Sequence, residues 1–373
     1  MGQTARGAIL IFLLLQLTND ATHGDIGVSN PLSEYVKCLP ANIPIPTFWD
    51  EAERALLTGT SLEAALGAKL RSLDGEFSLL QNKTSSIQWC RNHWWDSGTG
   101  KLSFDDWKHV DAMYRSRALD LPGTGHALVP YIDMANHASG ENTTALYETD
   151  GNGDAVLILR DGKRLTQNEE VTITYGDEKG ACEMLFSYGF IESTMTSAKE
   201  LFLDLDIPDD DPLKIVKKTA ADLAPGFRLF EQGDTVDWEG SFVWILCVNE
   251  EDGLDFKVLQ SIEGELELQA SWKGTEITDM SKLQNVLEKE ELWDVFHLRA
   301  VTTLQGRIEQ QLLRMEASKS YVQEALQTKP IRTSVGDNAL SLRDLEEVVM
   351  LNAYAEFEAR VTTKILRTIG VCS

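Results

Sequence analysis

The sequence predicts an α+β fold, with a helical N-terminal third, a short strand-rich stretch and a mostly helical C-terminal region. Three observations favour it. Apolar residues recur at helical spacing between residues 51 and 80. Glycine and proline separate short β-branched runs between residues 121 and 190. Apolar stripes at helical spacing return in the last third, and a chain of 373 residues is long enough for two or three domains.

The N-terminal third is predicted to be helical. Its clearest stretch is Glu51 to Leu80, which Gly59-Thr60 should interrupt. Upstream, the apolar run of residues 8–15 follows Arg6 and fits either a signal-peptide core or a buried helix. The run is too short to span a bilayer as a helix. Tryptophans 49, 94, 95 and 107 indicate packed contacts between helices.

Strands are predicted in the stretch that follows. Residues 155–159 and 171–175 are the best candidates, because both are short, β-branched and bounded by turns. Between them, Asp161-Gly162 predicts a turn. Residues 128–137 form another strand-like run, which ends in the polar pair Asn136-His137.

The C-terminal region begins after an acidic, proline-bearing segment at residues 204–212, which is typical of a linker or an edge loop. Further on, one apolar stripe follows helical spacing, and we interpret it as core packing: Met350, Tyr354, Phe357, Val361 and Ile365. Ser341, with Asp344 three residues later, resembles a capping box and predicts that this helix begins at Ser341.

Composition limits the classes of partner. Hydrophobic residues make up 43% of the chain, which is ordinary for a soluble globular protein rather than a disordered one. Lysine and arginine total 34 and aspartate and glutamate total 59, so the net charge is −25. Such a surface repels phosphate backbones, and we therefore expect no nucleic-acid partner. The charge either steers basic peptides toward the protein or serves solubility alone.

The five cysteines lie at wide spacings, at positions 38, 90, 182, 247 and 372. Their number is odd and none forms a C-x-x-C pair, so we expect no zinc site and a reducing, intracellular location. Two N-x-[ST] sequons, at Asn82 and Asn142, occur at a frequency that chance explains. A secreted glycoprotein of unrelated function is the alternative that they leave open.

Three short motifs follow one another along the middle of the chain. Asp133, Asn136 and His137 form D-x-x-N-H, Tyr175 stands at a predicted strand end before a glycine, and Tyr188 and Phe190 form Y-G-F. Each motif alone is weak evidence, because an Asn-His pair is more often a structural hydrogen-bonding pair than a ligand site. The ordered set of three is much more specific.

This ordered set resembles the SET-domain methyltransferases, in the branch of the Rubisco large-subunit lysine methyltransferase and its fungal and animal relatives. Arg115-Ser116-Arg117-Ala118 also resembles the R-S-R-A segment of that branch. The resemblance implies three parts: a helical insertion of the SET domain at 1–114, the C-terminal half of the SET domain with its strand core at 115–204, and a helical substrate-binding domain at 205–373. It also favours a buried N-terminal helix over a signal peptide.

The resemblance implies an S-adenosylmethionine-dependent protein-lysine N-methyltransferase without a metal. Tyr175 would be the catalytic residue, and Tyr188 and Phe190 would line the substrate channel. The implied cofactor-binding residues are Arg117, Asp133, Asn136, His137, Tyr175 and Phe190. The expected partner is a lysine-bearing protein, with neither a membrane nor a nucleic acid involved. We expect a monomer in the nucleus or cytoplasm.

The chemistry explains these residue types. Methyl transfer from a sulfonium to an amine is an in-line displacement, so positioning dominates the rate. The attacking lysine must be neutral, although its reference pKa is about 10.4. An apolar, aromatic-walled channel and a neighbouring cation both lower that pKa.

One feature departs from the pattern of this branch. Its SET domain begins with strands that carry a G-x-G loop, and nothing before Leu13 matches them. The strings at residues 123–125 and 151–153 lie after the insertion and are predicted to be loop glycines. The sequence therefore predicts a member without the N-terminal SET half, which puts the activity of this chain alone in doubt. Two alternatives stay open: a protein-histidine methyltransferase, and a non-catalytic binding module with a vestigial SET domain.

Overall fold

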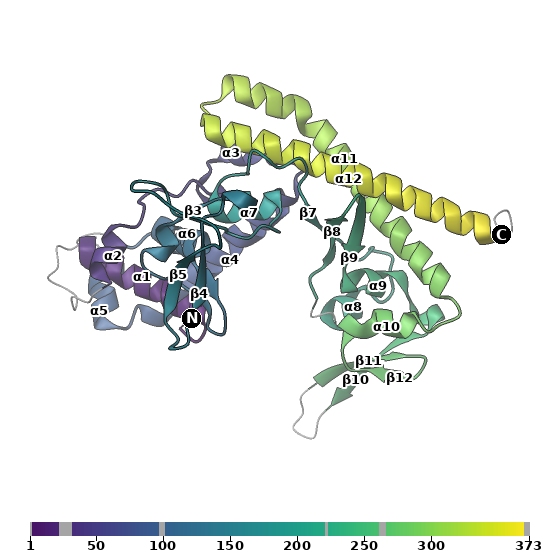
Figure 1. Ribbon diagram of the computed structural model, residues 1–373. Coiled ribbons are helices and arrows are strands. Elements are labelled where there is room, and N and C mark those ends of the chain that lie inside the picture. The colour runs from purple at the N-terminus through teal and green to yellow at the C-terminus, as the bar shows by residue number, and fades with distance from the viewer. Residues whose placement is uncertain (1, 22–31, 97–100, 221–222, 261–265, 369–373) are drawn as a thin grey trace. The chain divides into compact units, whose positions relative to one another are not determined.

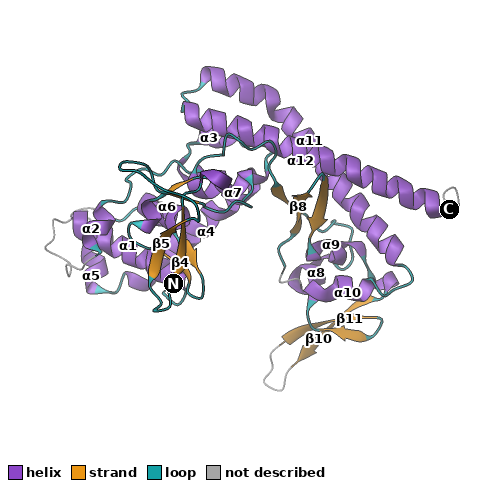
Figure 2. Ribbon diagram, viewed as in Figure 1, coloured by secondary structure: helices purple, strands orange, loops and turns teal. Residues whose placement is uncertain are grey.

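The computed structural model describes residues 2–21, 32–96, 101–220, 223–260 and 266–368 (Figure 1). The chain divides into two compact units, and the first comprises residues 1–54, 62–179 and 183–192. The second comprises residues 55–61, 180–182 and 193–373, so the predicted boundary at residue 204 lies inside it. Helices and strands are both present in each unit, which confirms the α+β class (Figure 2).

The first unit contains most of the short strands. Its helices are α1 (Ala5–Ala21), α2 (Ser33–Lys37), α3 (Glu51–Ala55), α4 (Ser61–Thr84), α5 (Gln88–Cys90), α6 (Phe104–Arg117) and α7 (Ala181–Tyr188), with a π-helical turn at Arg91–Trp95. Its strands are β1 (Leu119–Leu121), β2 (Gly125–Ala127), β3 (Asn136–His137), β4 (Ala145–Thr149), β5 (Ala155–Leu159) and β6 (Thr172–Ile173). The last residue of α3, the first residue of α4 and the first two of α7 belong to the second unit.

Helices α1, α4 and α6 enclose the main core of the first unit. The N-terminal apolar run forms α1 and buries Leu10, Leu13 and Leu14, as the prediction of a buried helix required. The interruption at Gly59-Thr60 separates α3 from α4, also as predicted. Among the described residues, no helix is both long and apolar enough to cross a membrane.

The described strands of this unit form three two-stranded sheets, β1-β2, β4-β5 and a parallel pair of β3 with β6. Strand β5 matches the predicted residues 155–159, and a turn follows it at Asp161-Gly162. The prediction of a strand over 171–175 was too long, because β6 has only two residues. The prediction of a strand-like run over residues 128–137 was wrong except at Asn136 and His137, which form β3. Tyr131 has a φ of 71° and a 3₁₀ turn covers Ile132–Met134, so the chain cannot stay extended there.

The second unit combines two three-stranded antiparallel sheets with helices. The first sheet has the order β7-β8-β9 and the second β10-β11-β12. The strands are β7 (Glu200–Asp204), β8 (Gly226–Gln232), β9 (Thr235–Glu239), β10 (Leu254–Gln260), β11 (Leu266–Trp272) and β12 (Thr275–Ile277). The helices are α8 (Lys214–Ala220), α9 (Ser241–Cys247), α10 (Leu283–Leu287), α11 (Trp293–Thr328) and α12 (Thr333–Thr368).

Helix α12 begins eight residues before the predicted start at Ser341, so the capping-box interpretation was wrong. Val335 and Ala339 are buried, and this packing extends the helix upstream. The predicted stripe is partly confirmed, since Met350 and Phe357 are fully buried. The side chain of Ile365 lies outside the described residues.

A buried polar cluster ties α12 to residues 56–61 of the same unit. Glu346 of α12 accepts hydrogen bonds from the Ser61 backbone N–H at 2.8 Å and from its hydroxyl at 2.5 Å. Arg343 donates to the carbonyl oxygens of Thr58 and Met315. Burial raises the pKa of Glu346 to about 7, although the bonds from Ser61 act in the opposite direction. The carboxyl group is therefore close to its titration point at neutral pH.

We expect Glu346→Gln to reduce the pH dependence of unfolding. A carboxyl group whose pKa is raised from 4.5 to about 7 binds more protons in the folded state, so the stability of the natural protein falls as pH rises across that window. Glutamine does not titrate and still offers an oxygen to the Ser61 N–H. Chemical denaturation of both proteins between pH 4.5 and 7 measures how steeply the free energy of unfolding changes with pH. Equal slopes for the natural protein and the variant would contradict the prediction.

Candidate active site

A pocket of about 340 Å³ lies in the first unit, between the end of α6, β1, β6 and α7. Its volume is in the range of small-molecule sites. Four of the seven predicted site residues line it: Arg117, Asp133, Tyr175 and Tyr188. The remaining three, Asn136, His137 and Phe190, are not among its lining residues.

Tyr175 is held at both ends by the segment that contains the Asn-His pair. Its hydroxyl donates to the Ala135 carbonyl oxygen at 3.0 Å, and its backbone N–H donates to Nδ1 of His137 at 3.0 Å. The Tyr175 ring stacks on the Tyr188 ring, with centroids 4.5 Å apart. Burial raises the pKa of Tyr175, so the phenol keeps its proton at neutral pH. The geometry thus presents a fixed, neutral hydroxyl at the pocket wall.

The hydrogen bonds to the two ring nitrogens of His137 define its tautomer. A backbone N–H can only donate, so Nδ1, which receives the Tyr175 N–H, carries no proton. The proton of the neutral ring therefore sits on Nε2, which lies 3.0 Å from a carboxylate oxygen of Glu192. The His137 side chain is 5% exposed and that of Glu192 is 12% exposed, so water competes little with this bond. Glu192 thereby fixes the orientation of the ring that anchors Tyr175.

The predicted aromatic residues come together around this anchor. The ring centroids of His137 and Phe190 are 5.9 Å apart, and those of Tyr188 and Phe190 are 6.4 Å apart. Burial also raises the pKa of Tyr188. The result is an aromatic cluster in which each ring contacts at least one other predicted site residue.

Asp133 links the pocket to the helical part of the unit. Its carboxylate accepts a 2.5 Å hydrogen bond from the Tyr35 hydroxyl, and its carbonyl oxygen accepts one from Nη1 of Arg117 at 3.0 Å. Burial raises the pKa of Asp133, although the bond from Tyr35 and the charge of Arg117 act to lower it. Among the described residues, Nε of Arg117 and Oδ1 of Asp133 are buried without a hydrogen-bond partner. These two atoms suit a ligand that brings its own polar groups into the pocket.

Asn136 differs from the other predicted residues, because its side chain is exposed and donates to Glu170 at 2.5 Å. Two residues of the site were not predicted, Tyr35 and Glu192. Tyr35 lies 98 positions before the residue that it contacts, and no motif marks it. Glu192 follows the Y-G-F motif by two positions, which was the only available signal. The described residues hold no group of three or more histidine, cysteine, aspartate or glutamate side chains that could bind a metal.

Comparison with known proteins gives relatives of one kind. The chain is 30% identical over 274 residues to SET domain-containing protein 8 of Schizosaccharomyces pombe, which covers 71% of this chain and 59% of the relative. It is also 30% identical over 218 residues to the [fructose-bisphosphate aldolase]-lysine N-methyltransferase of Arabidopsis thaliana, covering 54% of this chain and 42% of the relative. The chain thus spans roughly half the length of these relatives. No family profile matches it.

Solved structures agree with these relatives. The SET domain of LSMT bound to lysine and AdoHcy matches all of this chain and 83% of that chain, with a TM-score of 0.64 at 17% identity. Rubisco LSMT bound to AdoMet matches 99% of this chain and 80% of that chain, with a TM-score of 0.61 at 17% identity. These findings confirm the resemblance predicted from the sequence. The chain has the SET-domain fold and is similar in sequence to proteins named as N-methyltransferases.

Proposed function

We propose that this protein is an S-adenosylmethionine-dependent protein-lysine N-methyltransferase. The observation that carries the proposal is the Tyr175 hydroxyl, held 3.0 Å from the Ala135 carbonyl oxygen at the wall of the pocket. Relatives named as lysine methyltransferases, and a fold shared with Rubisco LSMT, support the same reaction.

The pocket offers residues that fit the cofactor. Arg117 is the cation suited to a carboxylate, and its unpartnered Nε supports that role. Asp133 lines the same pocket, His137 and Phe190 contact the Tyr175 ring, and Asn136 would reach the cofactor from the exposed side. When bound, S-adenosylmethionine supplies an electrophilic methyl group on a sulfonium centre.

Tyr175 and Ala135 would act on the transfer through their oxygen atoms. The hydroxyl donates to the Ala135 carbonyl oxygen at 3.0 Å, and its remaining lone pairs would stabilise a positively charged methyl group and orient an amine. Because burial raises the pKa of Tyr175, the hydroxyl acts as a neutral hydrogen-bonding group rather than as a phenolate base. Tyr188 lines the pocket and Phe190 packs against the Tyr188 ring, and these aromatic surroundings would favour a neutral lysine.

The proposed substrate is a lysine-bearing protein, bound by a monomer with no nucleic acid or membrane involved. The net charge of −25 supports a basic protein segment over a polyanion. The odd number and wide spacing of the cysteines support a nuclear or cytoplasmic location.

Titration with S-adenosylmethionine and methyl-transfer assays on the purified protein test this function. Calorimetry should detect S-adenosylmethionine binding, and labelled methyl groups should appear on lysine-containing peptides. Matched peptides with histidine in place of lysine provide the comparison. Transfer of methyl groups to histidine alone would show that histidine, not lysine, is the acceptor. Cofactor binding without any transfer across a broad protein extract would instead favour a non-catalytic binding module.

We expect Glu192→Leu to lower kcat about tenfold while KM changes little. The variant removes the acceptor for Nε2 of His137, so the ring that anchors the Tyr175 backbone loses its orientation, at the cost of about one hydrogen bond. Glu192→Gln keeps an acceptor oxygen and should restore most of the rate. Steady-state methylation kinetics distinguish the two variants. Equal losses in both would show that Glu192 does not act through the His137 tautomer.

A further inference from the structure

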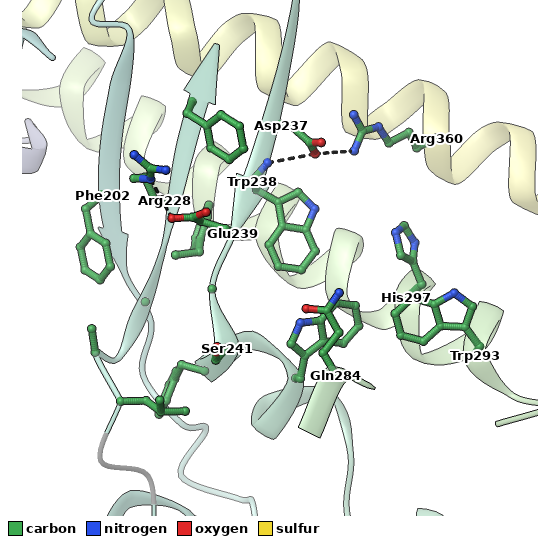
Figure 3. A pocket seen from close by; sticks show the side chains of 18 residues that line it. Phe202, Arg228, Asp237, Trp238, Glu239, Ser241, Gln284, Trp293, His297 and Arg360 are labelled. Atoms are coloured by element: carbon green, nitrogen blue, oxygen red, sulfur yellow. Dashed lines mark hydrogen bonds and ion pairs between the residues drawn. The ribbon is translucent and has the colours of Figure 1, made fainter. Parts of the chain in front are cut away.

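The second unit contains a separate pocket of about 820 Å³, lined by the β7-β8-β9 sheet, residues 223–224, α9, α11 and one residue each of α10 and α12 (Figure 3). The site proposed above for methyl transfer does not use it. Its most prominent feature is a wall of four aromatic rings: Trp238, Trp244, Trp293 and His297. Figure 3 shows Trp238 on one side of the pocket, with His297 and Trp293 on the other.

The four rings contact one another in the order Trp238, Trp244, Trp293 and His297. Ring centroids are 5.5 Å apart between Trp238 and Trp244, and 5.0 Å apart between Trp244 and Trp293. Trp293 and His297 meet at an interplanar angle of 68°, with centroids 5.7 Å apart. Trp244 is buried at 2% exposure, whereas the other three rings remain partly accessible. A partly accessible aromatic ring attracts a cation through its π face without a full ion pair.

The charged groups of the pocket are already paired. Asp237 accepts from Arg360 at 3.1 Å, and Glu239 accepts from Arg228 at 3.0 Å (Figure 3). Two carboxylates and two guanidinium groups cancel, so the lining is electrically balanced and strongly aromatic. The whole chain, in contrast, carries a charge of −25, which attracts basic segments from a distance.

We infer that this pocket binds the methylated ammonium group of a lysine in a basic peptide. An unmodified ammonium has three N–H donors and is strongly hydrated, so it needs acceptors to replace its water. The Asp237 and Glu239 carboxylates each accept from an arginine, which balances their charge at the pocket. A trimethylated ammonium keeps the positive charge, has no N–H donor and is held by aromatic faces alone.

This binding does not depend on the proposed catalysis, so the two proposals can fail separately. If both hold, the protein recognises the chemical product of its own reaction at a second site.

Three peptides with one basic sequence test the inference in the natural protein. The central residue is trimethyllysine, unmodified lysine, or the neutral analogue in which carbon replaces the quaternary nitrogen. Tryptophan fluorescence and calorimetry measure the dissociation constants without S-adenosylmethionine. We expect trimethyllysine to bind about tenfold more tightly than either comparison peptide. Equal binding of the neutral analogue would overturn the inference, because the pocket would then select apolar bulk. Absence of binding would also overturn it.

Variants locate the binding. Trp293→Ala and Trp238→Ala should abolish the preference for trimethyllysine, and Trp293→Phe, which retains an aromatic face, should keep part of it. Tyr321→Ala provides a matched control, since Tyr321 is an exposed aromatic residue of α11 outside the pocket. If the alanine variants fail to fold, Trp293→Phe and Trp238→Phe still test the inference, because each should reduce the preference for trimethyllysine. An unchanged preference in these variants would place the binding elsewhere and contradict the inference.

Discussion

Tyr175→Phe is expected to lower methyl-transfer turnover at least about a hundredfold while leaving the affinity for S-adenosylmethionine nearly unchanged. The change removes only the hydroxyl that donates to the Ala135 carbonyl oxygen. The bond from the backbone N–H to His137 and the stacking on Tyr188 both persist, so the pocket keeps its shape. An effect confined to kcat indicates an interaction made in the transition state.

Single-turnover methylation and cofactor calorimetry measure the two quantities. Tyr354→Phe is the matched control, because Tyr354 is a half-buried tyrosine of α12 that does not line the pocket. Near-normal turnover of Tyr175→Phe would contradict the role assigned to Tyr175. A large loss of cofactor affinity would instead indicate that the hydroxyl belongs to the binding site.

Asp111→Asn is expected to destabilise the first unit by about 3–5 kcal/mol, because removing one partner of a buried ion pair leaves uncompensated charge. The Asp111 side chain is fully buried and accepts from Arg6 at 2.6 Å, Lys69 at 2.8 Å and Arg115 at 2.9 Å. It therefore joins α1, α4 and α6. Arg115 also donates to the Phe186 carbonyl oxygen at 2.7 Å, so the same network supports the pocket.

Calorimetric unfolding measures this effect, which should lower the Tm of the first unit by roughly 10 °C. Asp105→Asn is the control, since Asp105 lies on the same helix with a side chain that is 77% exposed. That variant should change stability by less than about 0.5 kcal/mol. Equal Tm values for the two variants would show that the network around Asp111 contributes little.

The same network predicts a pH dependence. Burial acts to raise the pKa of Asp111, but Arg115, Lys69 and Arg6 overcome it, and the pKa is lowered from 3.8. A carboxyl group whose pKa is lowered on folding stabilises the folded state at pH values above its ordinary pKa. That stability is lost as the pH falls. The natural protein should therefore lose stability below about pH 4, and Asp111→Asn should lose less over the same range.

Local sequence patterns predicted the elements that depend on local interactions. The helix break at Gly59-Thr60 and the strand at 155–159 follow from periodicity and turn residues, and both were confirmed. The start of α12 was mispredicted because packing of Val335 and Ala339 outweighs the capping signal at Ser341. The predicted strand at 171–175 was shortened because its partner, β3, has only two residues.

The candidate site was predicted through its motifs, and the structure brings Tyr175, Tyr188, Phe190 and His137 together. Their individual roles stay predictions. Tyr35 could not have been found, because its contact with Asp133 depends on packing between distant segments. Glu192 could not be recognised either, since only the folded chain shows its carboxylate facing the His137 ring.

The measurement that tests the central claim most directly is the position of the transferred methyl group. The natural protein is incubated with S-adenosylmethionine carrying an isotopically labelled methyl group and a lysate depleted of basal methylation, and tandem mass spectrometry identifies the modified residue. Our account predicts labelled methyl groups on the side-chain nitrogen of lysine, formed at least about a hundredfold more slowly when Tyr175 is replaced by Phe. Labelling of histidine alone, or lysine labelling at an undiminished rate in Tyr175→Phe, would contradict it.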